Sequence, residues 1–579
     1  MVRIKMTKLI NMNRCIKITS KYAKQYKYRF IIAELCIIIL YSVSLILPWN
    51  LTRLVDNVVY EKNYSLLTNI IIVYFVLFLI STITNFFYAY IWQTLNNKYV
   101  VKIKTDMYEK LLRSKSKFLS GLNTGDAVAR VEWDSDQFIH VIQRNVFHLA
   151  NSLIMCVVII VFICINSIIM GVFAVASVLI PIIITKVLSK KTERLTQKSR
   201  HNAGILTGKV FELFSGFREI KLFNAQLWAE KQVLSPLEKM FDANNKQNII
   251  SLSIQKAALG VSICFTLAQY ILGAILVVNG HMTIGVFLAI IQYVSLLNYK
   301  FDWILTIYND WHWRKISLNR CCEILECESE QNNGTLITHI DSIEFKNVSF
   351  AYDDKLVLSN ISFKINKGEN VGLVGVSGVG KTTLISLLTK LYKPQSGEIL
   401  INGKNIESID TYNLRNVIGI VSQDIKLFND TIAYNLTFGK QIPDNKIESA
   451  LKKAQIHETV ANLPQKLETV IDENNVGLSG GQAQRIMIAR MLIKNADMYI
   501  CDEATSALDV NTECEIVSEL KSIMQGKIGI TISHRYQSLV NCDKIIVLKN
   551  GEIDAVGTDA ELMSCSDEYS SLFGGVVHA

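Results

Sequence analysis

A glycine-rich segment near the middle of the chain has the residue types that hold phosphate groups. Residues 375–383 read GVSGVGKTT, follow the apolar run 370–374 and precede a helical pattern over 384–391. Glycines let backbone N–H groups surround phosphate oxygens, and a helix N-terminus favours the same anion. The lysine reaches the β and γ oxygens of a nucleotide, and Thr382 supplies an oxygen to Mg²⁺. The candidate nucleotide-binding residues here are Gly375, Ser377, Gly378, Gly380, Lys381, Thr382 and Thr383.

Two adjacent acids follow a second apolar run and indicate where the nucleotide is cleaved. The predicted strand 498–501 runs directly into Asp502 and Glu503. An acid at the end of such a strand, beside a phosphate loop, holds Mg²⁺, usually through water. The next acid is then placed to polarise the attacking water as a general base. We therefore expect Asp502 at the metal together with Thr382, and Glu503 as the catalytic base.

A second anion site is predicted between these two motifs. Residues 478–482 read LSGGQ and open a helix, which puts Ser479, Gly480, Gly481 and Gln482 at a helix N-terminus. Backbone N–H groups bind anions at such a position. Because the phosphate loop of the same chain already provides one cradle, we expect the second cradle to close on a nucleotide held by another copy.

The two halves of the chain differ in composition. From residue 343 onward, short apolar runs alternate with helical patterns, which predicts an α/β domain that positions these motifs. Before about residue 315, apolar residues gather into runs of about 20, the length of a membrane-spanning helix. The 579 residues are 50% hydrophobic and 19% charged, whereas a soluble domain carries about 25% charge. A soluble nucleotide-hydrolysing enzyme is therefore excluded, and 12 scattered cysteines exclude a disulfide-stapled secreted scaffold.

Six membrane spans are predicted, at 31–51, 69–92, 147–165, 168–188, 254–278 and 282–303. Long basic connections alternate with short neutral ones: residues 1–29 hold nine lysines and arginines and no acid, whereas the connections after spans three and five hold no lysine or arginine. Because cations concentrate on the cytosolic side of a membrane protein, both termini are expected in the cytosol. The net charge of +9 then follows from membrane topology and does not indicate nucleic-acid binding.

The connections after spans two and four are long enough to reach a cytosolic domain. Both connections, at about 97–146 and 189–250, have helical periodicity. They are predicted to extend the spanning helices well beyond the lipid. Span six is expected to continue to Leu325, and a polar linker follows at 328–334. The predicted domains are a transmembrane domain over 1–315, a linker over 316–340 and a nucleotide-binding domain over 341–579.

Taken together, these motifs resemble the ATP-binding cassette (ABC) transporters. The whole chain is similar to a half-transporter of the type I exporter class, an α-helical membrane domain with six transmembrane helices followed by an α/β P-loop NTPase cassette, and residues 478–482 match the family's signature motif. The resemblance implies that Tyr352 stacks on adenine, that Gln423 senses Mg²⁺ and that His534 meets the γ-phosphate. It further implies that the loop ending at Asp509 communicates across a dimer.

Two polar segments of the first half extend the resemblance. Residues 123–126, with Arg130 and Asp134, are similar to the stretch that follows the first coupling helix in exporters. Residues 216–221 are similar to the second intracellular segment. Both lie where the family places them, after spans two and four.

The resemblance implies an ATP-driven, Mg²⁺-dependent exporter in the plasma membrane, surrounded by lipid and built from two chains, with a homodimer favoured and a heterodimer possible. A membrane cavity with few charges suits amphipathic drugs, lipids or modified peptides, and we expect export of a small molecule or peptide. Polar side chains that could contact the substrate, or join helices to one another, are Asn85, Tyr88, Asn151, Gln269, Gln292, Tyr293 and Asn298.

Three alternatives remain open. They are a siderophore importer of the same architecture, a lipid flippase, and a regulatory or immunity protein whose ATP cycle senses and does not pump. The presence of both Glu503 and His534 argues against the last. The use of many isoleucines, asparagines and lysines suggests a bacterial source with an AT-rich genome.

Overall fold

The chain is divided between a bundle of long helices and a compact α/β region. The computed structural model describes residues 12–122, 124–330, 332–353, 355–471 and 478–577. Within these ranges, residues 12–110 and 124–326 form one unit, the membrane unit, and residues 111–122 and 327–577 form the other, the cassette unit.

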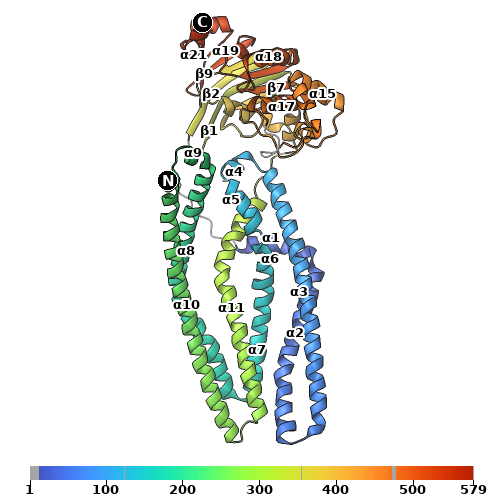
Figure 1. Cartoon of the computed structure of the whole chain (residues 1–579), viewed down its shortest axis with the longest axis vertical. Helices are drawn as coiled ribbons and strands as arrows, with labels where there is room; N and C mark the ends of the chain where they lie inside the picture. Colours follow the sequence, from blue (N-terminus) through green and yellow to red (C-terminus); the bar gives the residue numbers. More distant parts are fainter. Residues whose placement is uncertain (1–11, 123, 331, 354, 472–477, 578–579) are drawn as a thin grey trace. The chain divides into compact units, whose positions relative to one another are not determined.

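Helices dominate the membrane unit because a helix satisfies every backbone N–H and C=O group internally, which lipid requires. They are α1 (Met12–Gln25), α2 (Lys27–Arg53), η1 (Leu54–Tyr60), η2 (Tyr64–Leu66), α3 (Leu67–Leu112), α5 (Thr124–Ala129), η3 (Arg130–Asp134), α6 (Gln137–His140), η4 (Val141–His148), α7 (Leu149–Asn166), α8 (Ile168–Ser215), α9 (Phe217–Leu222), α10 (Gln226–Val278) and α11 (Ile284–Leu325). Figure 1 shows α2 beside α3, α8 beside α10, and α7 beside α11.

The apolar helices agree with the predicted spans. Among the residues that the structure describes, five helical stretches are long and apolar enough to cross a bilayer, namely Lys27–Tyr60, Tyr64–Leu112, Gly125–Asn166, Gln226–Val278 and Ile284–Ile307. The remaining predicted span, the fourth at 168–188, corresponds to a shorter apolar stretch, Ile168–Ile184, at the start of α8. Large apolar side chains such as Ile38, Phe78 and Ile271 lie exposed on these helices, as a surface that faces lipid requires.

The helices also continue beyond their apolar parts, as the periodicity predicted. Helix α8 runs on to Ser215 and α11 runs on to Leu325. The connection between α3 and α7 differs from a single helical extension. Helix α3 ends at Leu112, Lys115 is in an extended conformation, and a separate short helix, α4 (Ser116–Ser120), follows and belongs to the cassette unit.

Two sheets form the framework of the cassette unit. The strands are β1 (Ser342–Tyr352), β2 (Lys355–Asn366), β3 (Asn370–Val374), β4 (Ser396–Ile401), β5 (Lys404–Asn405), β6 (Ile418–Val421), β7 (Met498–Asp502), β8 (Ile528–Ile532), β9 (Lys544–Lys549) and β10 (Glu552–Gly557). One sheet has the order β2-β1-β4-β5 and is antiparallel. The other has the order β10-β9-β3-β8-β7-β6, in which only β9 and β10 are antiparallel.

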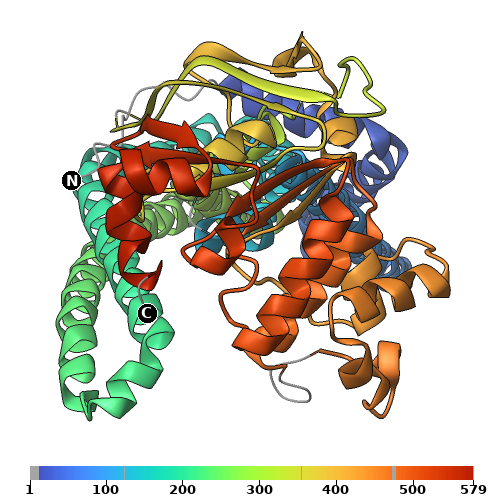
Figure 2. The same ribbon diagram turned by 90° about the horizontal axis from the view of Figure 1, so that it is seen from above.

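The cassette helices cover both faces of the larger sheet. They are α12 (Lys381–Leu388), η5 (Ile406–Ser408), α13 (Thr411–Asn416), α14 (Ile432–Thr437), α15 (Asp444–Lys453), α16 (His457–Ala461), η6 (Lys466–Glu468), α17 (Gly480–Ile493), α18 (Val510–Met524), α19 (Tyr536–Leu539), α20 (Asp559–Cys565) and α21 (Asp567–Val577). Alternate residues of β7 belong to different hydrophobic clusters: Ile500 shares one with Leu384 of α12, whereas Cys501 shares the other with residues of α17 and α18. Figure 2 shows the ribbon from above, with helices on either side of the strands of this unit.

This topology sets the position of the predicted motifs. Strands β3, β8 and β7 are adjacent and parallel, so the segments that follow them meet at one edge of the sheet. Ligands bind at that edge in open α/β sheets. The helix after the phosphate loop begins at Lys381, three residues before the predicted start, and ends at Leu388 because Lys390 adopts a left-handed conformation.

Candidate nucleotide-binding site

The phosphate loop links the end of β3 to the start of α12. Lys381 is 8% exposed, and its ammonium donates to the carbonyl oxygens of Gly375 at 2.6 Å and Val376 at 3.2 Å. Burial lowers the pKa of Lys381, and the charges of Glu503 and Asp502 oppose that shift. A lysine held inside the loop beside these acids is placed to contact nucleotide phosphates.

The backbone conformation of the loop explains why two of its positions are glycines. Gly375 has φ +153°, and a Cβ there would lie 2.5 Å from the Leu548 carbonyl oxygen. Gly380 has φ +114°, and its Cβ would lie 2.6 Å from a methyl group of Leu358 on β2. By contrast, the side of Gly378 where a Cβ would lie is open space, which leaves room for a phosphate group. Of the other predicted loop residues, Ser377 and Thr382 are exposed, and Thr383 is buried in α12.

Asp502 closes β7 and supplies the candidate metal ligand. It is 5% exposed, and burial, followed by the charge of Glu503, raises its pKa to about 6, whereas Lys381 and a hydrogen bond with Thr382 lower it. A buried carboxylate beside a hydroxyl is the kind of oxygen donor pair that Mg²⁺ takes alongside nucleotide phosphates. The two residues therefore fit a bound Mg²⁺, which when present would neutralise charge on the phosphates.

The raised pKa predicts that Asp502 lowers stability in the absence of metal. The folded state holds the Asp502 proton more tightly than the unfolded state, so this contribution to stability is present at low pH and is lost as pH rises from about 4 to about 6. At pH 7.5 the charged form costs about 3 kcal/mol. We expect Asp502→Asn to raise the thermal unfolding midpoint by about 5 °C at pH 7.5, with the difference vanishing near pH 4.

Unfolding followed by intrinsic fluorescence, without nucleotide or Mg²⁺, measures this difference. Asp353→Asn, at an exposed position of the same unit, is the control and should show no such pH-dependent gain. An unchanged or lower midpoint for Asp502→Asn at pH 7.5 would contradict the prediction.

Glu503 is held between side chains that follow two other strands. Its Oε2 accepts a hydrogen bond from Gln423 Nε2 at 3.0 Å, and its Oε1 lies 3.4 Å from His534 Nε2. Gln423 follows β6, and His534 follows β8. Glu503 itself has φ +52° and donates its backbone N–H to Ile532 at 2.9 Å. Gln423 and His534, which the sequence singled out separately, thus flank the Glu503 carboxylate.

One positioning residue was missed by the sequence analysis. Gln484 lies on α17 and is 2% exposed. Its Nε2 donates to the Glu503 carbonyl oxygen at 2.9 Å, and its Oε1 accepts from the Ala507 backbone N–H at 3.0 Å. It therefore ties the signature helix to the loop that carries Glu503. A sequence pattern could have indicated this role, because Gln484 is a polar residue among Ile486, Met487 and other apolar residues on the buried side of one helix.

The second predicted cradle is organised by its own helix start. Ser479 caps α17 by accepting from the Gln482 backbone N–H at 3.2 Å, and Gln482 Oε1 accepts from the Ser479 N–H at 2.9 Å. The side chains of Ser479 and Gln482 are thus occupied by this capping box. The backbone N–H groups of Gly480 and Gly481 remain to face an anion. The space beside Gly480 is nearly open, because a Cβ added there would meet only the Ala507 Cβ, at 3.8 Å.

Two further predicted residues lie at the edges of the site. The Asp509 carboxylate caps α18 by accepting from the Thr512 backbone N–H at 3.0 Å, which lowers its pKa. Tyr352, at the end of β1, is 39% exposed, and its ring meets the edge of Tyr392 with 5.1 Å between centroids. The β1–β2 hairpin that carries Tyr352 also packs on the phosphate loop, through Leu358.

The polar segment after span two forms an ionic network inside the membrane unit. Arg130 binds Asp126 at 2.8 Å and Glu323 of α11 at 2.7 Å, and Asp134 binds Arg320 of α11 at 2.9 Å. Residue 123, the first of that predicted segment, lies outside the described residues. The predicted second intracellular segment, 216–221, forms most of α9.

The linker is anchored within the cassette unit. Ser329 forms an antiparallel bridge with Ser114, just before α4. The next residue, Glu330, binds Arg415 through both carboxylate oxygens at 2.7 and 2.8 Å. The chain that leaves span two and the chain that leaves span six are therefore joined to each other and to the cassette.

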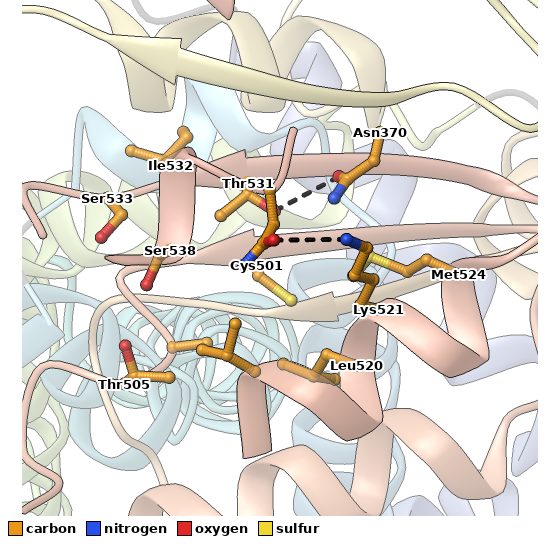
Figure 3. A pocket seen from close by; sticks show the side chains of 13 residues that line it. Asn370, Cys501, Thr505, Leu520, Lys521, Met524, Thr531, Ile532, Ser533 and Ser538 are labelled. Carbon is orange, nitrogen blue, oxygen red and sulfur yellow. Dashed lines mark hydrogen bonds between the residues drawn. The ribbon is translucent and has the colours of Figure 1, made fainter. Parts of the chain in front are cut away.

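A pocket in the cassette unit lies apart from these residues. Figure 3 shows Cys501, Thr505, Leu520 and Met524 around it, and it occupies the face of β7 and β8 that packs on α18. Because the phosphate-loop helix α12 covers the opposite face, this pocket is not the nucleotide site.

Comparisons with known proteins agree with this arrangement. The pattern of the ABC transporter transmembrane region matches residues 30–301, and the ABC transporter pattern matches residues 358–506. An export ATP-binding/permease protein of Rickettsia felis is 31% identical, with 95% of this chain and 97% of that protein covered. An ATP-dependent lipid A-core flippase of Syntrophus aciditrophicus is 29% identical over 95% and 93% of the two chains. The solved structure of a bacterial Atm1-family ABC exporter with ATP bound has the same fold, with a TM-score of 0.86, 24% identity, and 95% and 99% of the chains covered.

Proposed function

The chain belongs to the ABC transporter family and is an ATP-driven bacterial membrane exporter, and from this premise we propose that two copies together form each of its ATP sites. In this proposal the phosphate loop of one copy and the signature cradle of the other hold one ATP with Mg²⁺. Glu503 activates the attacking water, and His534 and Gln423 hold Glu503 in place.

The observation that carries this proposal is the presence of two anion cradles in one cassette. The loop 375–383 packs with α12 in one hydrophobic cluster, and the signature residues open α17 in the other. Among the described residues, no hydrogen bond joins 375–383 to 478–482. A nucleotide in the loop thus needs a second copy in order to meet a signature cradle, and ATP favours the closed pair because only that state uses both cradles.

The same closure supplies the transport step. Each cassette is continuous with the spans through the linker that Glu330 and Arg415 anchor, so movement of one cassette toward the other moves the ends of α3 and α11. Hydrolysis removes the γ-phosphate that favoured closure and lets the pair reopen. The basic connections favour a cytosolic position for both termini. We propose export of an amphipathic small molecule or peptide by a homodimer.

Transport into vesicles tests the function and its direction. We expect proteoliposomes with outward-facing cassettes to accumulate a labelled amphipathic compound when Mg²⁺ and ATP are added outside, and the same compound to stimulate ATP hydrolysis about two- to fivefold, because substrate favours the closing step. Lys381→Ala in the same lipid is the control. ATP-dependent loss of compound from preloaded vesicles would indicate import, and hydrolysis that no compound stimulates would favour a regulatory protein.

Lipid translocation is the second candidate. It is favoured by the relative named as a lipid A-core flippase. A fluorescent lipid whose leaflet is read by dithionite quenching, in the same vesicles, separates lipid translocation from export of a soluble compound.

A further inference from the structure

One end of the membrane unit brings an acid, an amide and aromatic rings together. Glu34 lies on α2, and its Oε2 accepts a hydrogen bond from Asn151 of α7 at 2.7 Å. Glu34 lies three residues and Asn151 four residues after the starts of predicted spans one and three, and Trp92 and Trp303 are the last residues of spans two and six. The charge pattern assigns these ends of the spans to the cytosol. Figure 1 shows α2, α3, α7 and α11 as neighbours in this unit.

The Glu34 carboxylate is poorly compensated. Its Oε1 is buried and has no hydrogen-bond partner among the described residues, and the Asn151 amide is the only side chain there that stabilises its charge. An ionisable group inside a span is costly and is typical of a functional site. A cation bound nearby would offset the negative charge of this carboxylate through space, without a hydrogen bond to Oε1.

Aromatic rings continue from this carboxylate across the ends of four helices. One turn before Glu34 and Asn151, Phe30 and Phe147 stack at 5.5 Å between ring centroids. Phe30 also meets Trp92 at 5.6 Å, which places α3 beside the pair. These contacts are edge-to-face or stacked arrangements that fix the rings.

Partly exposed rings extend the cluster. Tyr88 lies 6.2 Å from Trp92 and donates or accepts a hydrogen bond with His148 at 3.2 Å. His148 in turn stacks on Trp303 of α11, with 6.1 Å and 19° between the rings. Tyr88, His148 and Trp303 are each partly accessible.

The neighbouring lysine shows that a ring in this bundle already binds a cation. The Lys300 ammonium lies 3.9 Å from the centre of the Tyr41 ring. Tyr41 is seven residues after Glu34 on α2, about 10 Å along the helix axis. Lys300 is therefore engaged two turns away from the Glu34 carboxylate.

We propose that Glu34 and the rings of Tyr88, His148 and Trp303 form an entry site for hydrophobic organic cations. The rings provide apolar contact and cation–π attraction, and the carboxylate provides the field that selects positive charge. A quaternary cation fits best, because it has no N–H group that must reach the buried Oε1. The inference rests on the proposed export function in one respect, namely that the exported compound enters at this end of the bundle.

Binding of two near-isosteric ions tests the charge selectivity of the wild-type chain. Equilibrium dialysis of the purified full-length protein in lipid nanodiscs, without ATP, compares labelled tetraphenylphosphonium with tetraphenylborate. After correction for binding to empty nanodiscs, we expect the cation to bind at least about tenfold more tightly than the anion. Equal or weaker binding of the cation overturns the proposal. ATP hydrolysis, measured separately on the same preparation, reports on the proposed function independently.

Variants of Glu34 separate a binding role from a structural one. Glu34→Gln keeps an oxygen that can accept from Asn151 but removes the charge, and we expect it to lose the preference for tetraphenylphosphonium. Glu34→Asp keeps the charge and should keep the preference. Glu61→Gln, at an exposed position beyond η1, is the matched control and should bind like the wild type. If Glu34→Gln binds the cation as the wild type does, Glu34 acts only as a helix contact and the proposal fails.

Discussion

Replacing Glu503 by glutamine is expected to lower ATP turnover at least about a hundredfold, because a general base contributes about that much or more. ATP binding should be retained, since Lys381, Thr382 and the loop glycines are unchanged. Mg²⁺ should bind as before, because Asp502 is also unchanged.

The surroundings of Glu503 make this a clean substitution. A glutamine oxygen can still accept from Gln423 Nε2, now 3.0 Å from Glu503 Oε2. The new amide N–H group would then face His534 Nε2, which accepts a hydrogen bond when the neutral ring carries its hydrogen on Nδ1. The left-handed backbone at φ +52° is equally open to both residues. The change thus removes the basic oxygen and leaves the hydrogen-bond pattern.

Two measurements on the same purified protein check this expectation. Phosphate release reports the loss of turnover, and binding of a fluorescent ATP analogue reports the retained ATP binding. Glu515→Gln, at an exposed position of α18, serves as the control and should remain within about twofold of wild type. Near-normal hydrolysis by Glu503→Gln would remove Glu503 from its role, whereas loss of ATP binding would show that the substitution disturbed the phosphate loop.

The sequence was sufficient for the parts of the site that depend on backbone pattern. Strand β3, the glycine loop and α12 follow one another over residues 370–388, so local spacing alone identifies them. The two acids at the end of β7 were found in the same way, because a buried run that ends in two carboxylates is visible in the sequence. The spans were found from apolar length.

What could not be predicted is how side chains are used across the fold. The pairing of Gln484 with the Glu503 carbonyl depends on the approach of α17 to the end of β7, which no local pattern encodes. The capping roles of Ser479 and Asp509 depend on backbone angles at the helix starts. The pairing of Glu34 with Asn151 depends on how α2 and α7 are aligned along their axes. The apolar pattern of either helix alone does not determine this alignment.

Complementation between two inactive chains is expected to restore hydrolysis if ATP sites are shared. Lys381→Ala removes the phosphate contact in the loop. Gly480→Asp places a carboxylate in the signature cradle, where its Cβ meets only the Ala507 Cβ at 3.8 Å. An acid at the first helical position favours the helix, so α17 should keep its structure while the cradle repels phosphate. Each variant alone should lose at least about 90% of its turnover, since each spoils both sites of a homodimer.

A mixed pair contains one intact site, made from the loop of the Gly480→Asp chain and the cradle of the Lys381→Ala chain. Chains co-expressed with two different tags and purified through both give only mixed pairs. We expect these to hydrolyse ATP at up to about half the wild-type rate, far above either variant alone. A chain with both substitutions, paired with Lys381→Ala, has no intact site and is the control. If Gly480→Asp purified alone hydrolyses ATP like the wild type, the signature cradle does not hold nucleotide and each site belongs to one chain.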